Sequence, residues 1–319
     1  MEKTSVIAGN QAAKSANLTV EAVFGIPSKM PVVGFEAGHP LTPIKIGYVW
    51  DTKNVRDLLE WMSEPSPDPL WITGPTGCGK TEMAVQLGAG LNAPTIIVTG
   101  RKDAEPGEVL GRIWLENGST VFKPGLLIEA YEKGWLIIFD EIDGFCPEVG
   151  VCLHRLLEKK PVTLDNGYVA HPHTRTLMIA TANTRGDGEG GDIYASTNIF
   201  NLATLNRFEK WEMNYPPSDV EEEIIKSHLG SLDDRAIASM VKVAADIRVA
   251  YDQGHCPGPI SIRDLIRWGR KLMLCGHRTD VKPIYHSFDK AFGNGVNRHV
   301  RAALHKFVQT HFNVPAPTI

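Results

Sequence analysis

Eight consecutive residues form a phosphate-binding pattern in this chain. They follow an apolar run at residues 70–74 and open a helical pattern at residues 79–91. In that setting the pattern GxxxxGK[ST] directs backbone N–H groups at phosphate oxygens, and the helix N-terminus adds a favourable dipole. The lysine is expected to reach the β- and γ-phosphates, and the threonine to bind Mg²⁺. The sequence therefore predicts an ATP and Mg²⁺ site formed by Gly74, Pro75, Thr76, Gly77, Cys78, Gly79, Lys80 and Thr81.

Two adjacent carboxylates follow another apolar run. Residues 135–139 read Trp-Leu-Ile-Ile-Phe, and Asp140 and Glu141 come directly after them. A buried strand that ends in Asp is how P-loop enzymes hold Mg²⁺, usually through water, so we assign Asp140 to the metal. We expect Glu141 to polarise the attacking water as a general base. Asp143 is expected to cap a helix or to lie at an interface.

A single amide ends the next apolar run. Asn183 closes the segment LMIATAN at residues 177–183. If this segment is a strand beside the one that carries Asp140, its last side chain lies near the γ-phosphate. An amide can orient a water molecule there, so we place Asn183 in the catalytic set.

The elements that position these residues follow from alternating patterns. Short apolar runs at 70–74, 95–100, 135–140 and 177–183 alternate with helical patterns near 79–91, 125–133 and 147–159. Strands that alternate with helices are typical of a parallel sheet with crossover helices. Beyond about Pro216 every pattern is helical. The expected fold class is α/β: a P-loop core with a parallel sheet and flanking helices, followed by an all-helical lid subdomain.

The same patterns predict three parts of the chain. Residues 1–45 form an N-terminal arm and strap. Residues 1–17 are disordered or an arm, a short apolar element EAVFGI follows, and the Pro- and Gly-rich residues 26–45 form an irregular strap. Residues 46–215 form the α/β ATPase core, and residues 216–319 form the helical lid.

Composition indicates a soluble cytoplasmic protein. The chain has 319 residues, a net charge of −4 and a pI of about 6.3, which argues against a constitutive nucleic-acid binder but leaves nucleic acid possible as a partner. We find no signal-peptide pattern and no apolar run near the ~18 residues of a membrane span. The cysteines are odd in number and lack a CxxC pair, which favours reduced thiols: Cys78, Cys146, Cys152, Cys256 and Cys275.

The ordered motifs GPTGCGKT, FDEID, ATANT and LNRF resemble the layout of AAA+ ATPases. The segments EAVFGIPSKMPV, HRLLEKKPVTLDNGYVAHPHTRTLMIATANT and GGDIYASTNIFNLATLNRFEKWEMNYPP resemble the MoxR branch of that superfamily. Within the branch, they are most similar to the CobS-like ATPase subunits of aerobic cobaltochelatase. The resemblance covers most of the chain.

The resemblance implies further site residues. Arg207 matches the arginine finger, which reaches the ATP of a neighbouring subunit, although Asn206 stands where relatives often carry an acid. Arg263 matches the sensor-2 arginine of the lid, with Arg267 and Arg270 as alternatives on the same helix. Tyr48, Val49 and Trp50 either wrap the adenine or are plain core.

Two insertions also match the branch. Residues 104–125 resemble the helix-2 insert, which lines the central opening of the ring in relatives. Residues 161–173 resemble the pre-sensor-1 hairpin, and Asp165-Asn166-Gly167 predicts a type I′-like turn within it.

The resemblance implies an ATP-hydrolysing ring motor, most often a hexamer, that remodels a partner protein. That partner would carry a von Willebrand factor A domain, as in a chelatase-type assembly, but no metal-binding domain or chelatase catalytic site is visible in this sequence. Two alternatives remain: an ATP-driven motor on DNA in a virus or mobile element, and an ATP-gated scaffold with little turnover.

Overall fold

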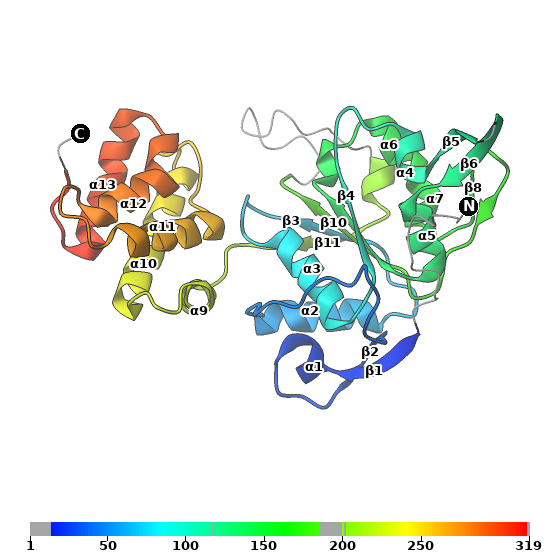
Figure 1. The fold of residues 1–319 in the computed structure, drawn as a ribbon, viewed down its shortest axis with the longest axis horizontal. Helices are drawn as coiled ribbons and strands as arrows, with labels where there is room; N and C mark the ends of the chain where they lie inside the picture. Colours follow the sequence, from blue (N-terminus) through cyan, green and yellow to red (C-terminus); the bar gives the residue numbers. More distant parts are fainter. Residues whose placement is uncertain (1–13, 117, 185–199, 201, 318–319) are drawn as a thin grey trace. The chain divides into compact units, whose positions relative to one another are not determined.

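The structure, a computed structural model, describes residues 14–116, 118–184, 200 and 202–317. The described chain divides into two compact units (Figure 1). The first comprises Met1–Gly74 and Lys80–Met213, and the second comprises Pro75–Gly79 and Asn214–Ile319. Residues 1–13 of the expected arm lie outside the described residues.

A five-stranded sheet forms the centre of the first unit. Its spatial order is β11–β3–β10–β7–β4, and each neighbouring pair runs parallel. The carboxyl ends of these strands therefore lie at one edge of the sheet, where the residues that follow β3, β7 and β10 come together. This confirms the predicted α/β class. The strands are β3 (Leu70–Thr73), β4 (Thr95–Thr99), β7 (Leu136–Asp140), β10 (Leu177–Ala182) and β11 (Glu209–Glu212).

Helices cover both faces of this sheet. Because successive side chains of a strand point to opposite faces, Ile137 and Phe139 of β7 lie on one face and Leu136 and Ile138 on the other. The helices of the first unit are α2 (Thr52–Ser63), α3 (Lys80–Gly90), α4 (Pro106–Leu110), α5 (Leu126–Lys133), α6 (Pro147–Cys152), α7 (His154–Leu157) and α8 (Leu202–Leu205).

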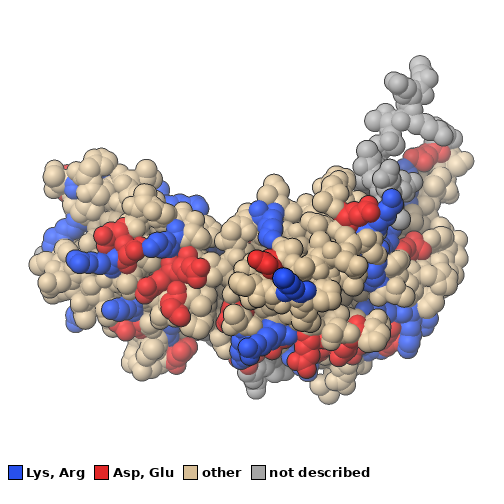
Figure 2. All heavy atoms as spheres, turned by 90° about the horizontal axis from the view of Figure 1, so that it is seen from below, with Lys and Arg blue, Asp and Glu red and all other residues tan. Residues whose placement is uncertain are grey.

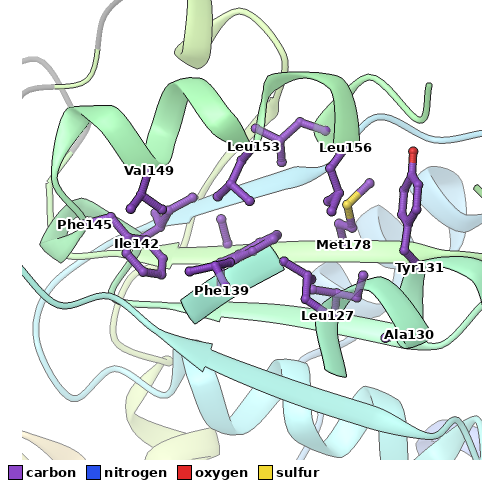
Figure 3. Close-up of a cluster of buried hydrophobic side chains, with 14 of the residues drawn as sticks. Leu127, Ala130, Tyr131, Phe139, Ile142, Phe145, Val149, Leu153, Leu156 and Met178 are labelled. Atoms are coloured by element: carbon purple, nitrogen blue, oxygen red, sulfur yellow. The ribbon is translucent and has the colours of Figure 1, made fainter. Parts of the chain in front are cut away.

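The larger core of the first unit lies between the sheet and α5, α6 and α7. Figure 3 shows Phe139 of β7 surrounded by Leu127 of α5, Val149 of α6 and Leu153, which lies between α6 and α7. On the other face α3 approaches so closely that a Cβ on Gly88 would lie 3.1 Å from Leu136 Cδ2. Burying each large apolar side chain contributes about 1.5–3 kcal/mol, so this packing fixes where the strands end.

The N-terminal strap is more regular than predicted. Strands β1 (Ser15–Thr19) and β2 (Pro31–Phe35) pair antiparallel, and α1 (Val20–Phe24) lies between them. The hydroxyl of Thr19 caps α1 by accepting the N–H of Ala22 at 3.1 Å, and Gly25 ends the helix with a positive φ of 72°. The expectation of an irregular strap over residues 26–45 was therefore wrong at Pro31–Phe35.

Both insertions contain two-stranded ribbons. In the first, β5 (Gly111–Glu116) pairs antiparallel with β6 (Ser119–Pro124), and Ile113, Trp114 and Leu115 are more than half exposed. In the second, β8 (Val162–Thr163) pairs with β9 (Val169–Ala170).

The predicted type I′ turn in the second ribbon was wrong. Among the described residues only Gly167 has a positive φ there, and its N–H donates to the carbonyl of Leu164. A type I′ turn requires a positive φ at Asn166 as well, whereas a longer loop with a single left-handed glycine does not.

The second unit is helical beyond Asn214. Trp268, Phe288 and Ile247 are fully buried in a core of its own, and the side chain of Ser261 caps α11 reciprocally with Asp264. No helix in the described part of the chain is long and apolar enough to cross a membrane. The helices are α9 (Ser218–His228), α10 (Asp234–Asp252), α11 (Ile262–Cys275), α12 (Pro283–Ala291) and α13 (Arg298–Phe312), with a 3₁₀ turn at Gly293–Gly295.

Candidate nucleotide site

The glycine-rich loop connects β3 to α3, as its sequence predicts. Gly77 and Gly79 have φ values of 75° and 106°, a backbone conformation that side chains other than glycine rarely adopt. Such a conformation turns successive N–H groups toward one point, which suits phosphate oxygens.

Lys80 and Asn183 meet at the carboxyl edge of the sheet. Lys80 is only 7% exposed, and its Nζ donates to the carbonyl of Gly74 at 2.8 Å and to Oδ1 of Asn183 at 3.1 Å. The residues after β3 and β10 are thus within hydrogen-bonding distance although 103 positions separate them. The structure therefore brings the predicted phosphate-binding lysine and the predicted water-orienting amide together.

Asp140 lies between two threonine hydroxyls. Oδ1 of Asp140 accepts a hydrogen bond from Oγ1 of Thr81 at 2.6 Å and another from Oγ1 of Thr181 at 2.7 Å. Thr81 and Asp140 are the two residues that we assigned to Mg²⁺. Their oxygens are the hard ligands that this ion prefers, and they already lie within one hydrogen bond of each other, so the residues fit the metal.

Glu141 stands on a strained turn at the end of β7. Its φ of 50° and ψ of 49° are left-handed, which costs a non-glycine residue roughly 1–3 kcal/mol. Its N–H donates to Oγ1 of Thr181 at 3.2 Å, and its side chain is exposed. An exposed carboxylate directly after Asp140 can contact an attacking water molecule.

Gly100 makes room for the Glu141 turn. Its N–H donates to the carbonyl of Asp140 at 2.7 Å, and a Cβ at this position would lie 2.0 Å from the carbonyl oxygen of Glu141. A side chain on Gly100 would therefore push the Glu141 backbone away.

Asp143 is neither a helix cap nor an interface acid in the described chain. It is 1% exposed, and its Oδ2 accepts the N–H of Asn183, the N–H of Thr184 and the hydroxyl of Thr184 at 2.9–3.1 Å. The carboxylate therefore joins the turn after β7 to the end of β10 and fixes the backbone from which the Asn183 side chain projects.

The aromatic segment predicted to contact adenine lies beside α3. The rings of Tyr48 and Trp50 are 4.6 Å apart between centroids, and both are only half-buried. Gln86 of α3 holds the preceding residues in place: it accepts the N–H of Ile46 at 3.0 Å and donates to the carbonyl of Ile44 at 3.2 Å. A half-buried aromatic pair on this segment is compatible with a base pocket. The adenine role of Tyr48, Val49 and Trp50 stays a prediction.

Two further arginines were predicted for the site. Arg207 follows α8 in the first unit, where its guanidinium contacts Glu158. Arg263 is exposed at the start of α11 in the second unit. The finger and sensor-2 roles remain predictions.

Sequence reasoning missed four positioning residues. Thr181 has a local signal, because it is a buried hydroxyl within the apolar segment LMIATA. Gly100, Gln86 and Glu158 have none, since each acts on a residue that is 40 or more positions away.

Comparison with known proteins places this geometry in a family. Residues 69–198 match the AAA domain of the dynein-related subfamily, and residues 221–311 match the CbbQ/NirQ/NorQ C-terminal family. The chain belongs to the MoxR branch of the AAA+ ATPases. It has the P-loop fold of that family, in which nucleotide binding and ATPase activity are general properties.

Individual relatives agree with this placement. The chain is 28% identical to the aerobic cobaltochelatase subunit CobS of Sinorhizobium sp, over 93% of this chain and 91% of that protein. It is also 28% identical to protein CbbQ of Hydrogenophilus thermoluteolus, over 59% of this chain and 67% of the relative.

A solved structure of a Thermotoga maritima RuvB P216G mutant shares the fold. Its TM-score is 0.51 at 16% identity, covering 83% of this chain and 73% of that one. At this identity the likeness concerns the fold alone.

Proposed function

We propose that this chain hydrolyses ATP to ADP and phosphate with Mg²⁺ as cofactor. The observation that carries the proposal is the convergence of side chains from the start of α3, the end of β7 and the residue after β10 at one edge of the sheet. There Lys80 contacts Asn183, and Thr81 contacts Asp140, through hydrogen bonds of 2.6–3.1 Å. These side chains supply a phosphate cradle, oxygen ligands and a water-orienting amide within one small region.

Each side chain has a defined task in this proposal. Lys80 binds the β- and γ-phosphates, and Thr81 and Asp140 hold Mg²⁺, which supplies charge neutralisation at the phosphates. Glu141 accepts a proton from the attacking water, and Asn183 orients that water through its amide. The hydrogen bond between Lys80 and Asn183 would be exchanged for bonds to the γ-phosphate when ATP binds.

The catalytic set of one subunit is incomplete without an arginine from another. Arg207 follows α8, and we propose that its guanidinium reaches the ATP of a neighbouring subunit in a ring, most simply a hexamer. An arginine supplied in trans stabilises the transition-state charge and contributes about 10³–10⁵ in rate. Arg263 of α11 is the proposed sensor-2 residue of the lid.

The proposed role of this ring is to remodel a partner protein. The similarity to CobS, which extends over nearly the whole of both chains, supports a chelatase-type assembly with a von Willebrand factor A protein as the partner. The DNA-motor alternative receives less support. On the face drawn in Figure 2, the Lys and Arg side chains of the described residues are interspersed with Asp and Glu, whereas phosphate tracking favours a basic stripe.

Phosphate release from ATP and Mg²⁺ by the purified chain tests the hydrolysis proposal. Replacing Glu141 with Gln should lower kcat by about 10²–10⁴-fold, because the general base is lost while the ATP contacts remain. Glu60→Gln, on the exposed side of α2, is the matched control and should keep the wild-type rate. A Glu141→Gln rate equal to wild type would exclude Glu141 as the base.

The same assay separates the proposed roles. Stimulation by a von Willebrand factor A protein is expected, and stimulation by DNA alone would contradict the remodelling proposal. A rate that stays near zero with either addition would instead favour an ATP-gated scaffold.

A further inference from the structure

Arg207 is held within its own chain by a carboxylate that follows α7. Nε of Arg207 donates to Oε1 of Glu158 at 2.7 Å, and Nη2 lies 2.5 Å from the same oxygen. Nη1 donates to the carbonyl of Ala203, one helical turn earlier. The guanidinium is therefore fixed from two sides, by its own helix and by Glu158.

Among the residues that the structure describes, these contacts leave part of the guanidinium available. Arginine carries five N–H donors in a planar fork, and the three contacts account for at most three of them. Glu158 occupies the edge formed by Nε and Nη2. The edge formed by Nη1 and Nη2 retains N–H groups, and such an edge can bind a phosphate with two parallel hydrogen bonds.

Glu158 is itself constrained. Nζ of Lys160 lies 2.7 Å from its Oε2, while Arg207 uses Oε1. The hydrogen bonds from Lys160 and Arg207 hold the pKa of Glu158 below its usual value, so the carboxylate is charged at neutral pH.

A second contact joins the same two helices. Nε2 of His154 on α7 lies 2.7 Å from Oγ1 of Thr204 on α8. Burial lowers the pKa of His154, and the charge of Arg207 lowers it further, so the imidazole is neutral at this position. Helix α8, which Arg207 follows, is thus attached to α7, which Glu158 follows, independently of the ion pair.

The expected contribution of the ion pair to stability distinguishes a stabilising role from a role in positioning Arg207. The Arg207 and Glu158 side chains are 23% and 27% exposed. Ion pairs with access to solvent contribute only about 0–1 kcal/mol to stability. Loss of this pair should therefore leave the fold intact while freeing the guanidinium to adopt other rotamers.

We propose that Glu158 is a positioning residue for the arginine finger: it holds Arg207 by the Nε edge and so presents the Nη edge to a phosphate bound by the next subunit. This inference rests on the proposed role of Arg207 and extends it, because it assigns the partner within the same subunit that orients the finger. Glu158 also places an acidic side chain next to Arg207, whereas the residue that precedes Arg207 in the sequence, Asn206, is not acidic.

Steady-state ATP hydrolysis by the full chain tests this inference. Glu158→Ala should lower kcat by about 10- to 100-fold, the cost of misplacing a catalytic group by about 1 Å, with little change in KM or melting temperature. In an Arg207→Ala background, measured at high enzyme concentration, Glu158→Ala should have no further effect because no guanidinium remains to be oriented. Glu158→Gln keeps an acceptor oxygen without the charge and should give an intermediate kcat.

The matched control is Glu129→Ala. It breaks another ion pair of the first unit, with Lys133, in which Glu129 is 33% exposed, and should leave kcat unchanged. The inference fails if Glu158→Ala has the wild-type kcat. It also fails if Glu158→Ala lowers kcat by the same factor in the presence and in the absence of Arg207. If Arg207→Ala loses activity and Glu158→Ala does not, the inference about Glu158 is wrong while the proposed function still holds. A wild-type chain that does not hydrolyse ATP contradicts the proposed function as well.

Discussion

Asp143 shows how a single buried carboxylate can couple two parts of the site. One oxygen accepts three hydrogen bonds from Asn183 and Thr184, which follow β10, while the residue itself lies three positions after Asp140. A shift in the turn that carries Glu141 must therefore be transmitted to the backbone of Asn183. The carboxylate acts through that backbone and has no need to contact the nucleotide.

The Asp143 contacts lead to a prediction about two substitutions. Asp143→Ala removes the acceptor of three hydrogen bonds, and the loss of a buried partner costs about 1–3 kcal/mol, so both the free energy of unfolding and kcat should fall. Asp143→Asn keeps an oxygen that can accept all three bonds and should be close to wild type in both. Chemical denaturation and phosphate release measure the two quantities. Equal stability of the Ala and Asn variants would show that these bonds do not determine the geometry.

At the scale of elements, the end of β4 supports the end of β7. Gly100 follows β4 and contacts the Glu141 carbonyl so closely that no side chain fits without a shift. The strained backbone of Glu141 is thus maintained by its neighbours in the sheet.

Replacing Gly100 with Ala should therefore displace Glu141. We expect kcat to fall by at least about 10-fold, since small displacements of a catalytic group have effects of this size, while ATP still binds through the loop after β3. Binding of a fluorescent ATP analogue and turnover measure the two separately. Gly107→Ala is the control, because a Cβ there meets nothing within 4 Å. A Gly100→Ala enzyme with normal turnover would contradict the supporting role.

The same scale shows what the sequence can and cannot predict. Four of the five strands of the central sheet were predicted to within one or two residues, because each is a short apolar run bounded by glycine or polar residues. The fifth, β11, was missed because its sequence Glu-Lys-Trp-Glu is not an apolar run. The β1–β2 ribbon was missed, since its strands are stabilised by backbone bonds to each other and not by a periodic pattern. The Glu158–Arg207 pair joins residues 49 positions apart and leaves no local signal, so only the fold reveals it.

At the scale of the whole molecule, each compact unit has its own buried core. Trp71 and Phe139 belong to the core of the first unit, and Trp268 and Phe288 to that of the second.

Lys159 of the first unit is an exception to the rule that charges remain hydrated. Its Nζ donates to the carbonyl of Pro67 at 2.7 Å, and burial lowers the pKa of Lys159 to about 8 although Asp68 and Glu64 oppose the shift.

Lys159 predicts a pH dependence of stability. In the unfolded chain its pKa is about 10.4, so between pH ~8 and ~10.4 the unfolded state binds more protons than the folded state. The contribution of Lys159 to the free energy of unfolding therefore rises with pH across this window. Below pH ~8 the cost to stability of burying the charged ammonium group is fully present. Lys159→Met should remove the rise. Denaturant titrations at several pH values, compared between the two proteins, measure it, and equal pH slopes would contradict the prediction.

The β5–β6 ribbon has a consequence for the unassembled chain. Ile113, Trp114 and Leu115 are exposed by 66%, 53% and 73% on a ribbon that has only two strands among the described residues. Apolar side chains on open strand edges favour self-association into aggregates. This ribbon therefore limits the colloidal solubility of the free chain. A cell that makes the chain benefits when the concentration of the chain matches that of the molecule that covers the ribbon.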